Sequence, residues 1–247
     1  MREQRLIDIL DTVKAKGYTT TQELAEMLDV SVSTVRRDLS ELTQRGLVGL
    51  SKNGVIPISD TIIDTPVSFR STVNVHAKSV IAKNALQLVR SGSTVFLDSS
   101  STVLQMVSGL RNLRNIIVVT NSLPVLTRLM GSSVPVHLIG GEMSPLSRGF
   151  FGPIAERALR QFNFDLAFFS PVAVTPRGFA AETAESAASL RKAAMEQAQS
   201  SALLFDHTKL GLTRAYNIAH IDAFQYLITD DQKHTLETTS IIRRVQS

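Results

Sequence analysis

The feature that most constrains this chain is a segment with strong helical periodicity at residues 31–44, SVSTVRRDLSELTQ. Apolar residues at i, i+4 and i+7 form one stripe if the segment is a helix: Val35, Leu39 and Leu42. Arg36 and Arg37 then point away from that stripe. The start of this helix would present hydroxyl side chains, unpaired backbone N–H groups and two guanidinium groups. Such groups can bind the phosphate backbone and the base edges of DNA. The alternative for this segment alone is an ordinary amphipathic surface helix.

Two shorter helical patterns precede this segment. Apolar residues recur at helical spacing from Leu6 to Val13. Residues 20–23, TTQE, match a capping box in which Thr20 and Glu23 begin a second helix. Only a few residues join the second and third helices, which is the spacing of a helix-turn-helix motif. The segment 31–44 is therefore the predicted recognition helix for the major groove.

Residues 47–55, LVGLSKNGV, follow Gly46 and predict two short strands around an Asn-Gly turn. A hairpin behind the recognition helix predicts a winged helix, with a wing lysine near a phosphate. Up to Asp60 the chain holds eight Lys and Arg against nine Asp and Glu, so this part is not net basic. The prediction of DNA binding therefore rests on where the positive side chains lie and not on net charge. A three-helix scaffold that binds protein is the alternative. The predicted DNA contacts are Ser31, Ser33, Thr34, Arg36, Arg37 and Lys52.

Composition excludes several other classes of protein. The 247 residues include no cysteine, which excludes disulfides, thiolate metal sites and a cysteine nucleophile. No apolar run approaches the roughly 20 residues of a membrane span, and the charged N-terminus does not resemble a signal peptide. We therefore expect a cytoplasmic protein without a membrane partner.

From His76 onward, strand and helix patterns alternate, which predicts a doubly wound, mostly parallel α/β sheet buried on both faces. We expect helices at 80–89, 103–110, 124–130 and 184–198, and strands at 94–97, 116–120, 134–139, 164–169, 202–205 and, last, 224–229. Residues 58–75 lack a clean period and predict a linker. The expected domains are a winged helix-turn-helix at 1–57 and a sensor at 76–247.

Ligands of such sheets bind at the carboxyl ends of the strands. Residues 99–102 also lead into a helix start, where an anion is favoured, so we predict a phosphate cradle. A helix cap without a ligand is the alternative, and Asp98 has the alternative role of supporting its loop. Lys192 is expected to be solvated. The predicted effector site comprises Asp98, Ser99, Ser100, Ser101, Thr102, Thr120, Asn121, Gly140, Gly141, Asp206 and Lys209.

Two long stretches resemble the DeoR family of bacterial transcriptional regulators. Residues 20–50, with VSVSTVRRDL at 30–39, resemble its N-terminal domain, although SKNG at 51–54 replaces the usual His-Gly-Gly of the wing. Most of 78–231 resembles its sensor, which shares a fold with ribose-5-phosphate isomerase and coenzyme A transferases. The matching pieces are FLDSSST at 96–102, VTNS at 119–122, IGG at 139–141, GP at 152–153 and DHTKLG at 206–211.

This resemblance implies a regulator, commonly a repressor of a carbohydrate operon, that responds to a phosphorylated sugar or related metabolite. It implies operator DNA as a partner and a homodimer or homotetramer, with no cofactor besides the effector, no metal and no catalytic residue. Ser100 stands where the family usually has glycine, and Ala187 and Ala188 where acidic residues are usual. Two alternatives remain: a sugar-phosphate isomerase-like enzyme with an appended helix-turn-helix, and a DNA binder with a degenerate sensor.

Overall fold

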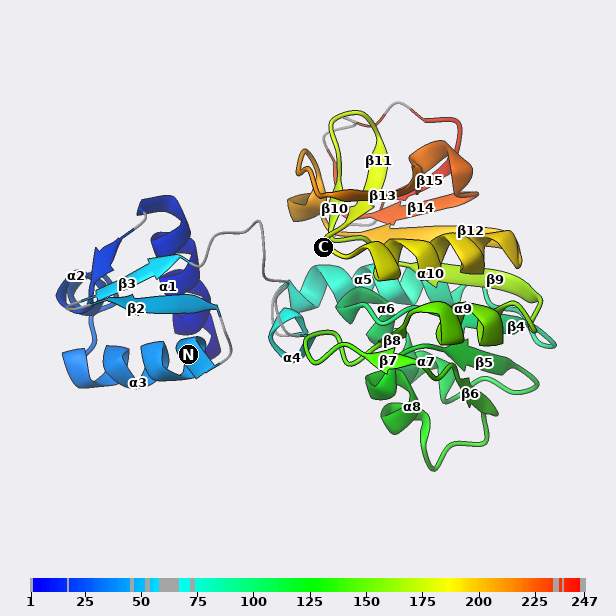
Figure 1. Cartoon of the computed structure of the whole chain (residues 1–247), viewed down its shortest axis with the longest axis horizontal. Coiled ribbons are helices and arrows are strands. Elements are labelled where there is room, and N and C mark those ends of the chain that lie inside the picture. Colours follow the sequence, from blue (N-terminus) through cyan, green and yellow to red (C-terminus); the bar gives the residue numbers. More distant parts are fainter. Residues whose placement is uncertain are drawn as a thin grey trace. The chain divides into compact units, whose positions relative to one another are not determined.

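The computed structural model of the chain describes residues 2–16, 18–44, 47–51, 54–57, 67–71, 74–232, 236 and 238–244. The chain divides into two compact units, Met1–Val73 and Asn74–Ser247. Figure 1 draws the first in blue to cyan and the second in cyan to red. None of the described helices has the length and apolar composition that a membrane span needs.

The first unit is a winged helix, which confirms the prediction. Its sheet is antiparallel, in the order β1-β3-β2. The expected turn residue Lys52 lies outside the described residues, as do Gly46 and the linker up to Pro66. The elements are α1 (Arg2–Lys16), β1 (Thr19–Thr20), α2 (Thr21–Met27), α3 (Val32–Gln44), β2 (Val48–Ser51) and β3 (Gly54–Pro57), followed by a short helix, α4 (Val67–Arg70).

The capping box at the start of α2 forms as predicted. The Thr20 hydroxyl accepts a hydrogen bond from the Glu23 N–H at 3.1 Å, and the Thr20 N–H donates to the Glu23 carboxylate at 2.7 Å. The Glu23 carboxylate accepts hydrogen bonds from the Thr20 N–H and from the Thr20 hydroxyl. These two bonds hold the pKa of Glu23 below its ordinary value. Two otherwise unpaired N–H groups are thus satisfied, which fixes where α2 begins.

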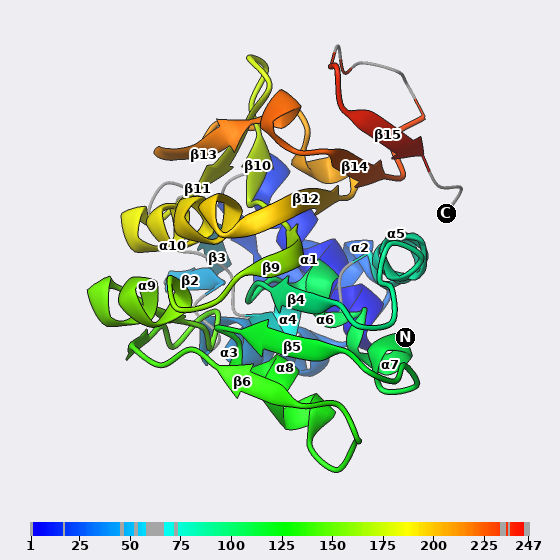
Figure 2. The ribbon, with the colours of Figure 1, turned by 90° about the vertical axis from the view of Figure 1, so that its right-hand side faces the viewer.

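The second unit is built on a seven-stranded, fully parallel sheet in the order β15-β14-β12-β9-β4-β5-β6. Figure 2 shows the strands stacked in this order, which confirms the predicted doubly wound sheet. The prediction that residues 224–229 form the last strand was wrong, because β15 pairs beyond it. The strands are β4 (Thr94–Leu97), β5 (Ile117–Thr120), β6 (Val136–Leu138), β9 (Phe164–Phe169), β12 (Ala198–Phe205), β14 (Tyr226–Thr229) and β15 (Ile241–Arg244).

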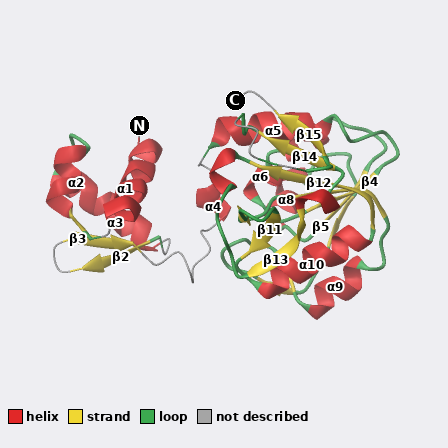
Figure 3. Ribbon diagram, turned by 90° about the horizontal axis from the view of Figure 1, so that it is seen from above, coloured by secondary structure: helices red, strands yellow, loops and turns green. Residues whose placement is uncertain are grey.

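Side chains that alternate along the strands enter two separate hydrophobic cores. Phe96 enters one core with α9 (Pro153–Leu159) and α10 (Glu185–Glu196). Its neighbour Val95 enters the other, with α5 (Val75–Leu86) and α8 (Leu123–Leu129). Figure 3 shows α9 and α10 on one side of the strands and α5 on the other. Both faces of the sheet are therefore buried, as parallel sheets require.

Several short elements were not predicted. The expected helix at 103–110 is two helices, α6 (Ser101–Leu104) and α7 (Val107–Leu110), because i→i+3 bonds at Gln105 and Met106 interrupt it. α9 was missed, and so were a hairpin and a second, antiparallel sheet. These comprise β7 (Glu142–Met143) with β8 (Phe150–Phe151), and β10 (Ala173–Val174), β11 (Phe179–Glu182) and β13 (Tyr216–His220).

Candidate functional site

The amino end of α3 gathers the hydroxyl residues predicted to contact DNA. The Ser31 hydroxyl lies 2.8 Å from that of Ser33 and 2.9 Å from that of Thr34, and it accepts the Thr34 N–H at 3.2 Å. Arg36 and Arg37 follow within the next turn and are exposed. Five of the six predicted residues therefore lie within residues 31–37, four of them on α3 and Ser31 directly before it, and Lys52 lies outside the described residues.

The opposite face of α3 is anchored to α1. The predicted stripe of Val35, Leu39 and Leu42 is fully buried. Asp38 is buried on the same face, and its Oδ2 accepts a hydrogen bond from Arg5 Nε at 2.5 Å. This bond raises the pKa of Arg5, in spite of the opposing effect of burial. The ion pair fixes α3 against α1 while its outer face remains available to a ligand.

At the carboxyl edge of the parallel sheet, the ladder register aligns the predicted effector residues. Leu97 pairs with Thr120 on one side and with Phe168 on the other. The residues that follow these strand ends therefore come together, including Asp98 and Asn121. The chain leads from β4 to β5 on one side of the sheet and from β9 to β12 on the other side. The carboxyl ends of β4 and β9 therefore form the topological switch point, where such folds bind ligands.

Asp98 occupies the switch point, and both of its carboxylate oxygens are engaged. Oδ1 accepts the Ser100 N–H at 3.0 Å. Oδ2 accepts the Ser170 N–H at 3.1 Å and Arg191 Nε at 2.9 Å. Through these contacts Asp98 supports its own loop, which was the alternative role expected from the sequence. Contact between Asp98 and an effector stays a prediction.

Arg191 is a residue that sequence reasoning missed. It lies on α10 with 7% of its side chain exposed, and its Nη1 is 3.3 Å from Glu182 Oε1 of β11. The guanidinium therefore joins two buried carboxylates, those of Asp98 and Glu182, at the centre of the edge. Its neighbour Lys192 is exposed, as expected.

The hydroxyl run after Asp98 contributes chiefly to local structure. The Ser100 hydroxyl accepts the Val103 N–H at 3.3 Å and caps α6, which is the helix-cap alternative for this residue. The Thr120 hydroxyl donates to the Leu97 carbonyl at 2.6 Å. Ser99, Ser101 and Thr102 are also buried. The cradle as a phosphate site stays a prediction.

The hairpin of β7 and β8 packs directly on this edge. Asn121 Nδ2 donates to the Phe150 carbonyl at 3.1 Å, and Gly149 bridges to Ser122. A Cβ on Gly149 would lie 2.5 Å from Ser99 Oγ, so only glycine allows so close an approach. Asn121 is 1% exposed, and its Oδ1 has no hydrogen-bond partner among the described residues.

The two predicted glycines differ in their surroundings. Gly141 has φ of +143°, and a Cβ there would lie 2.5 Å from the Phe151 carbonyl oxygen. Glycine at this position therefore allows the chain to pass close to β8. Gly140 is exposed with open space around it.

A second polar cluster forms where β12 ends. Asp206 Oδ1 accepts hydrogen bonds from Asn74 Nδ2 at 3.1 Å, the Thr208 N–H at 3.1 Å, and the Thr208 hydroxyl. Oδ2 is buried without a hydrogen-bond partner among the described residues. Burial tends to raise the pKa of Asp206. The Thr208 hydroxyl and the ammonium groups of Lys209 and Lys78 outweigh it, so the pKa lies below its ordinary value of 3.8.

We expect this shift to make sensor stability depend on pH. A carboxyl whose pKa is lowered by folding stabilises the fold above its ordinary pKa, and the contribution disappears as the pH falls through the lower folded value. The free-energy difference between wild type and Asp206→Asn should therefore shrink as the pH falls from about 6 to about 3 in urea unfolding. Glu185→Gln, an exposed change on α10, is the control. If the free-energy difference between wild type and Asp206→Asn stays constant or grows as the pH falls, folding does not lower the pKa of Asp206.

Comparison with known families decides the class of protein. A model described as the DeoR-like helix-turn-helix domain matches residues 5–61, and the DeoR C terminal sensor domain matches residues 73–231. The chain belongs to the DeoR family. It is thus a member of a family of transcriptional regulators, and α2 and α3 lie within its helix-turn-helix domain.

Two relatives and one solved structure are among the known proteins that this chain is similar to. The transcriptional repressor AccR of Agrobacterium fabrum is 28% identical, over 96% of this chain and 93% of its own length. The glycerol-3-phosphate regulon repressor of Escherichia coli is 29% identical, over 92% and 90%. Ribose 5-phosphate isomerase A of Methanocaldococcus jannaschii has a TM-score of 0.42 and 20% identity, over 56% of this chain and 55% of its own.

Proposed function

We propose that this DeoR-family chain is a repressor of a carbohydrate operon, and that a phosphorylated sugar or polyol at the carboxyl edge of the sensor sheet controls its binding to operator DNA. The observation that carries the proposal is the pair of buried acceptors at that edge, Asn121 Oδ1 and Asp206 Oδ2. Neither has a hydrogen-bond partner among the described residues.

Buried acceptors without donors are rare in folded proteins, because the lost hydration is not replaced. Sugar and polyol hydroxyls donate hydrogen bonds to such oxygens. Together with the hydrogen bond from the Thr208 hydroxyl, the positive potential of the Lys209 and Lys78 ammonium groups lowers the pKa of Asp206. The same potential favours a phosphate group nearby. A phosphorylated polyol combines both kinds of group in one molecule.

The relatives support the direction of regulation. Both similar proteins are named as repressors, and one name specifies the glycerol-3-phosphate regulon. We propose a homodimer or homotetramer in the cytoplasm, because helix-turn-helix proteins bind two-fold operators through two copies. No cofactor besides the effector, no metal and no catalytic step belong to the proposal. Asp98, one of the candidate acid/base groups for an isomerase-like reaction, already has both oxygens engaged in hydrogen bonds.

The test has two stages. Selection of bound fragments from random double-stranded DNA first gives an operator sequence. Fluorescence anisotropy then measures whether that DNA is released by glycerol-3-phosphate and a panel of sugar phosphates, with the unphosphorylated compounds as controls. Release by a phosphorylated compound alone is expected. Selection of no sequence would contradict the DNA-binding role, and selection of a sequence that no panel compound releases would contradict the effector class.

We expect Lys209→Ala to separate the two activities. It should bind the selected operator like wild type but need at least about tenfold more effector for release, because a charge near the phosphate is lost. Lys192→Ala removes an exposed ammonium from α10 and serves as the matched control. Equal effector responses in wild type and Lys209→Ala would place the phosphate elsewhere.

A further inference from the structure

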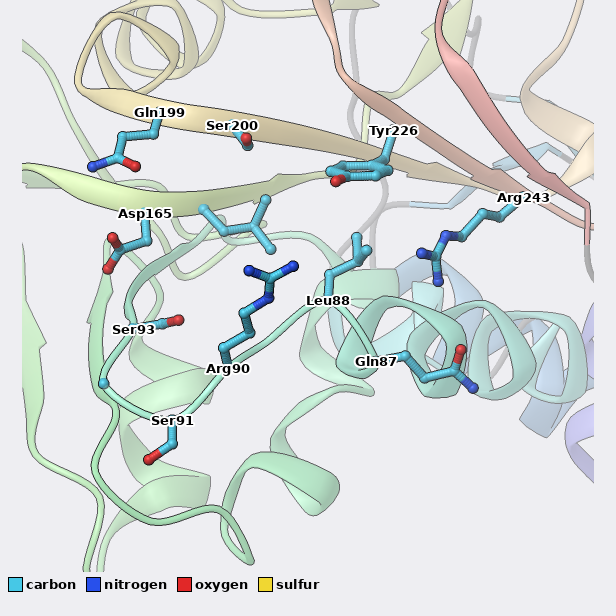
Figure 4. A pocket seen from close by; sticks show the side chains of 12 residues that line it. Gln87, Leu88, Arg90, Ser91, Ser93, Asp165, Gln199, Ser200, Tyr226 and Arg243 are labelled. Atoms are coloured by element: carbon cyan, nitrogen blue, oxygen red, sulfur yellow. The ribbon is translucent and has the colours of Figure 1, made fainter.

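A hollow lies at the opposite, amino edge of the parallel sheet (Figure 4). Its volume is about 510 Å³, within the range of roughly 300–1,000 Å³ that small-molecule sites occupy. It is bounded by the turn after α5 and by residues of β9, β12, β14 and β15. The four-residue strand β4 spans about 13 Å, so the two edges of the sheet form separate sites.

Two arginines define the charge of this pocket. Figure 4 shows the guanidinium groups of Arg90, from the turn after α5, and Arg243, from β15, extending on either side of Leu88. Within the described part of the chain, neither guanidinium forms a hydrogen bond or an ion pair. Arg243 lies with its guanidinium carbon 5.7 Å from the ring centre of Tyr226.

The rest of the lining is apolar at the centre and polar around it. Leu88 and the Tyr226 ring lie in the part between the arginines, with serine and glutamine side chains nearby, and Leu166 also lines the pocket. Asp165 is the one acidic residue of the lining, and its Oδ2 already accepts the Thr94 N–H at 2.7 Å. Two arginines against one aspartate leave a formal charge of +1.

We propose that this pocket binds a small organic dianion with an acidic group at each end. A guanidinium forms two parallel hydrogen bonds with a carboxylate or phosphate, and Arg90 and Arg243 offer one such fork on each side of Leu88. The carbon chain of the ligand lies on Leu88 and Tyr226 between them. The site is independent of the effector site at the carboxyl edge.

Isothermal titration calorimetry of the full-length protein tests this site with succinate, glutarate and adipate, and with butyrate as a monoanion control. At least one dicarboxylate should bind about tenfold more tightly than butyrate, because it engages both forks. Arg90→Ala and Arg243→Ala should each weaken that binding by about tenfold or more. Arg177→Ala is the matched control, since its guanidinium also lies over a ring, 5.8 Å from Phe179, but outside this pocket.

Three outcomes would overturn the proposal: no dicarboxylate binds, butyrate binds equally well, or both alanine variants bind like wild type. Circular dichroism shows whether each variant is folded. Arg90→Lys and Arg243→Lys keep the charge but lose the fork, so they provide a second test if an alanine variant fails to fold. These lysine variants should bind the dicarboxylate with an affinity between those of wild type and the alanine variants. Wild-type affinity in both lysine variants would show that the arginines do not bind the ligand through two parallel hydrogen bonds.

Discussion

Replacing both Arg36 and Arg37 with alanine is expected to weaken operator binding by at least about thirtyfold. Each guanidinium that contacts a base or a phosphate contributes about 1–3 kcal/mol, and each lost phosphate contact lowers the salt slope by about one. Both side chains are exposed on the outer face of α3, so the stability of the winged helix should be unchanged. Anisotropy titrations at several salt concentrations measure both quantities.

Lys16→Ala is the control for this experiment, because it removes an exposed positive charge from α1 of the same unit. It should leave the affinity for the selected operator close to that of wild type. Wild-type affinity in the double arginine variant, with an unchanged salt slope, would remove α3 from the DNA interface.

Arg191→Ala is expected to lower the free energy of unfolding of the sensor by about 3–5 kcal/mol. The change removes the cation that joins Asp98 and Glu182 and leaves two carboxylates buried without it. Asp98 also holds the N–H groups of Ser100 and Ser170, so the loop at the switch point should loosen with it. Urea unfolding followed by circular dichroism measures the change.

Lys192→Ala tests the specificity of that effect, since it truncates the next residue of α10, which is exposed. Its effect should stay within about 0.5 kcal/mol. A double-mutant cycle with Asp98→Asn and Arg191→Met isolates the interaction between the two side chains. Stability of Arg191→Ala within about 1 kcal/mol of wild type would show that this buried pair does not hold the edge together.

Much of the winged helix could be predicted because its signals are local. The stripe of Val35, Leu39 and Leu42 and the capping box of Thr20 and Glu23 each lie within a few residues of sequence. Asp38 falls on the same stripe, three residues after Val35, but its partner could not be placed in the same way. Its burial depends on Arg5, 33 residues earlier, and no periodicity indicates that the two meet.

Arg191 did leave a signal that could have been used. Ala187, Leu190 and Ala194 are buried and share one helical face with Arg191, at i, i+3, i+4 and i+7. An arginine within a buried stripe indicates a carboxylate partner in the core. The signal was obscured because alanine occupies several faces of this helix, which hides the boundary between inside and outside.

The location of the candidate effector site at the carboxyl edge could be predicted, because parallel strands end at the same edge and polar residues follow their ends in the sequence. Its chemistry could not, since Asp98 and Asp206 look alike in sequence. One has both oxygens engaged and the other has a buried oxygen without a hydrogen-bond partner among the described residues. Strands of two residues, such as β7 and β10, were missed because they are too short to show alternation and form through distant contacts.

The division of α3 into a buried and an exposed face also bears on how such a chain changes over evolutionary time. Folding depends on Val35 and Asp38, whereas Ser33, Arg36 and Ser40 are exposed. Substitutions at exposed positions usually alter stability by less than about 0.5 kcal/mol. Selection for a new operator and selection for a folded protein therefore act on different positions. A lineage can exchange one target sequence for another through intermediates that all remain folded.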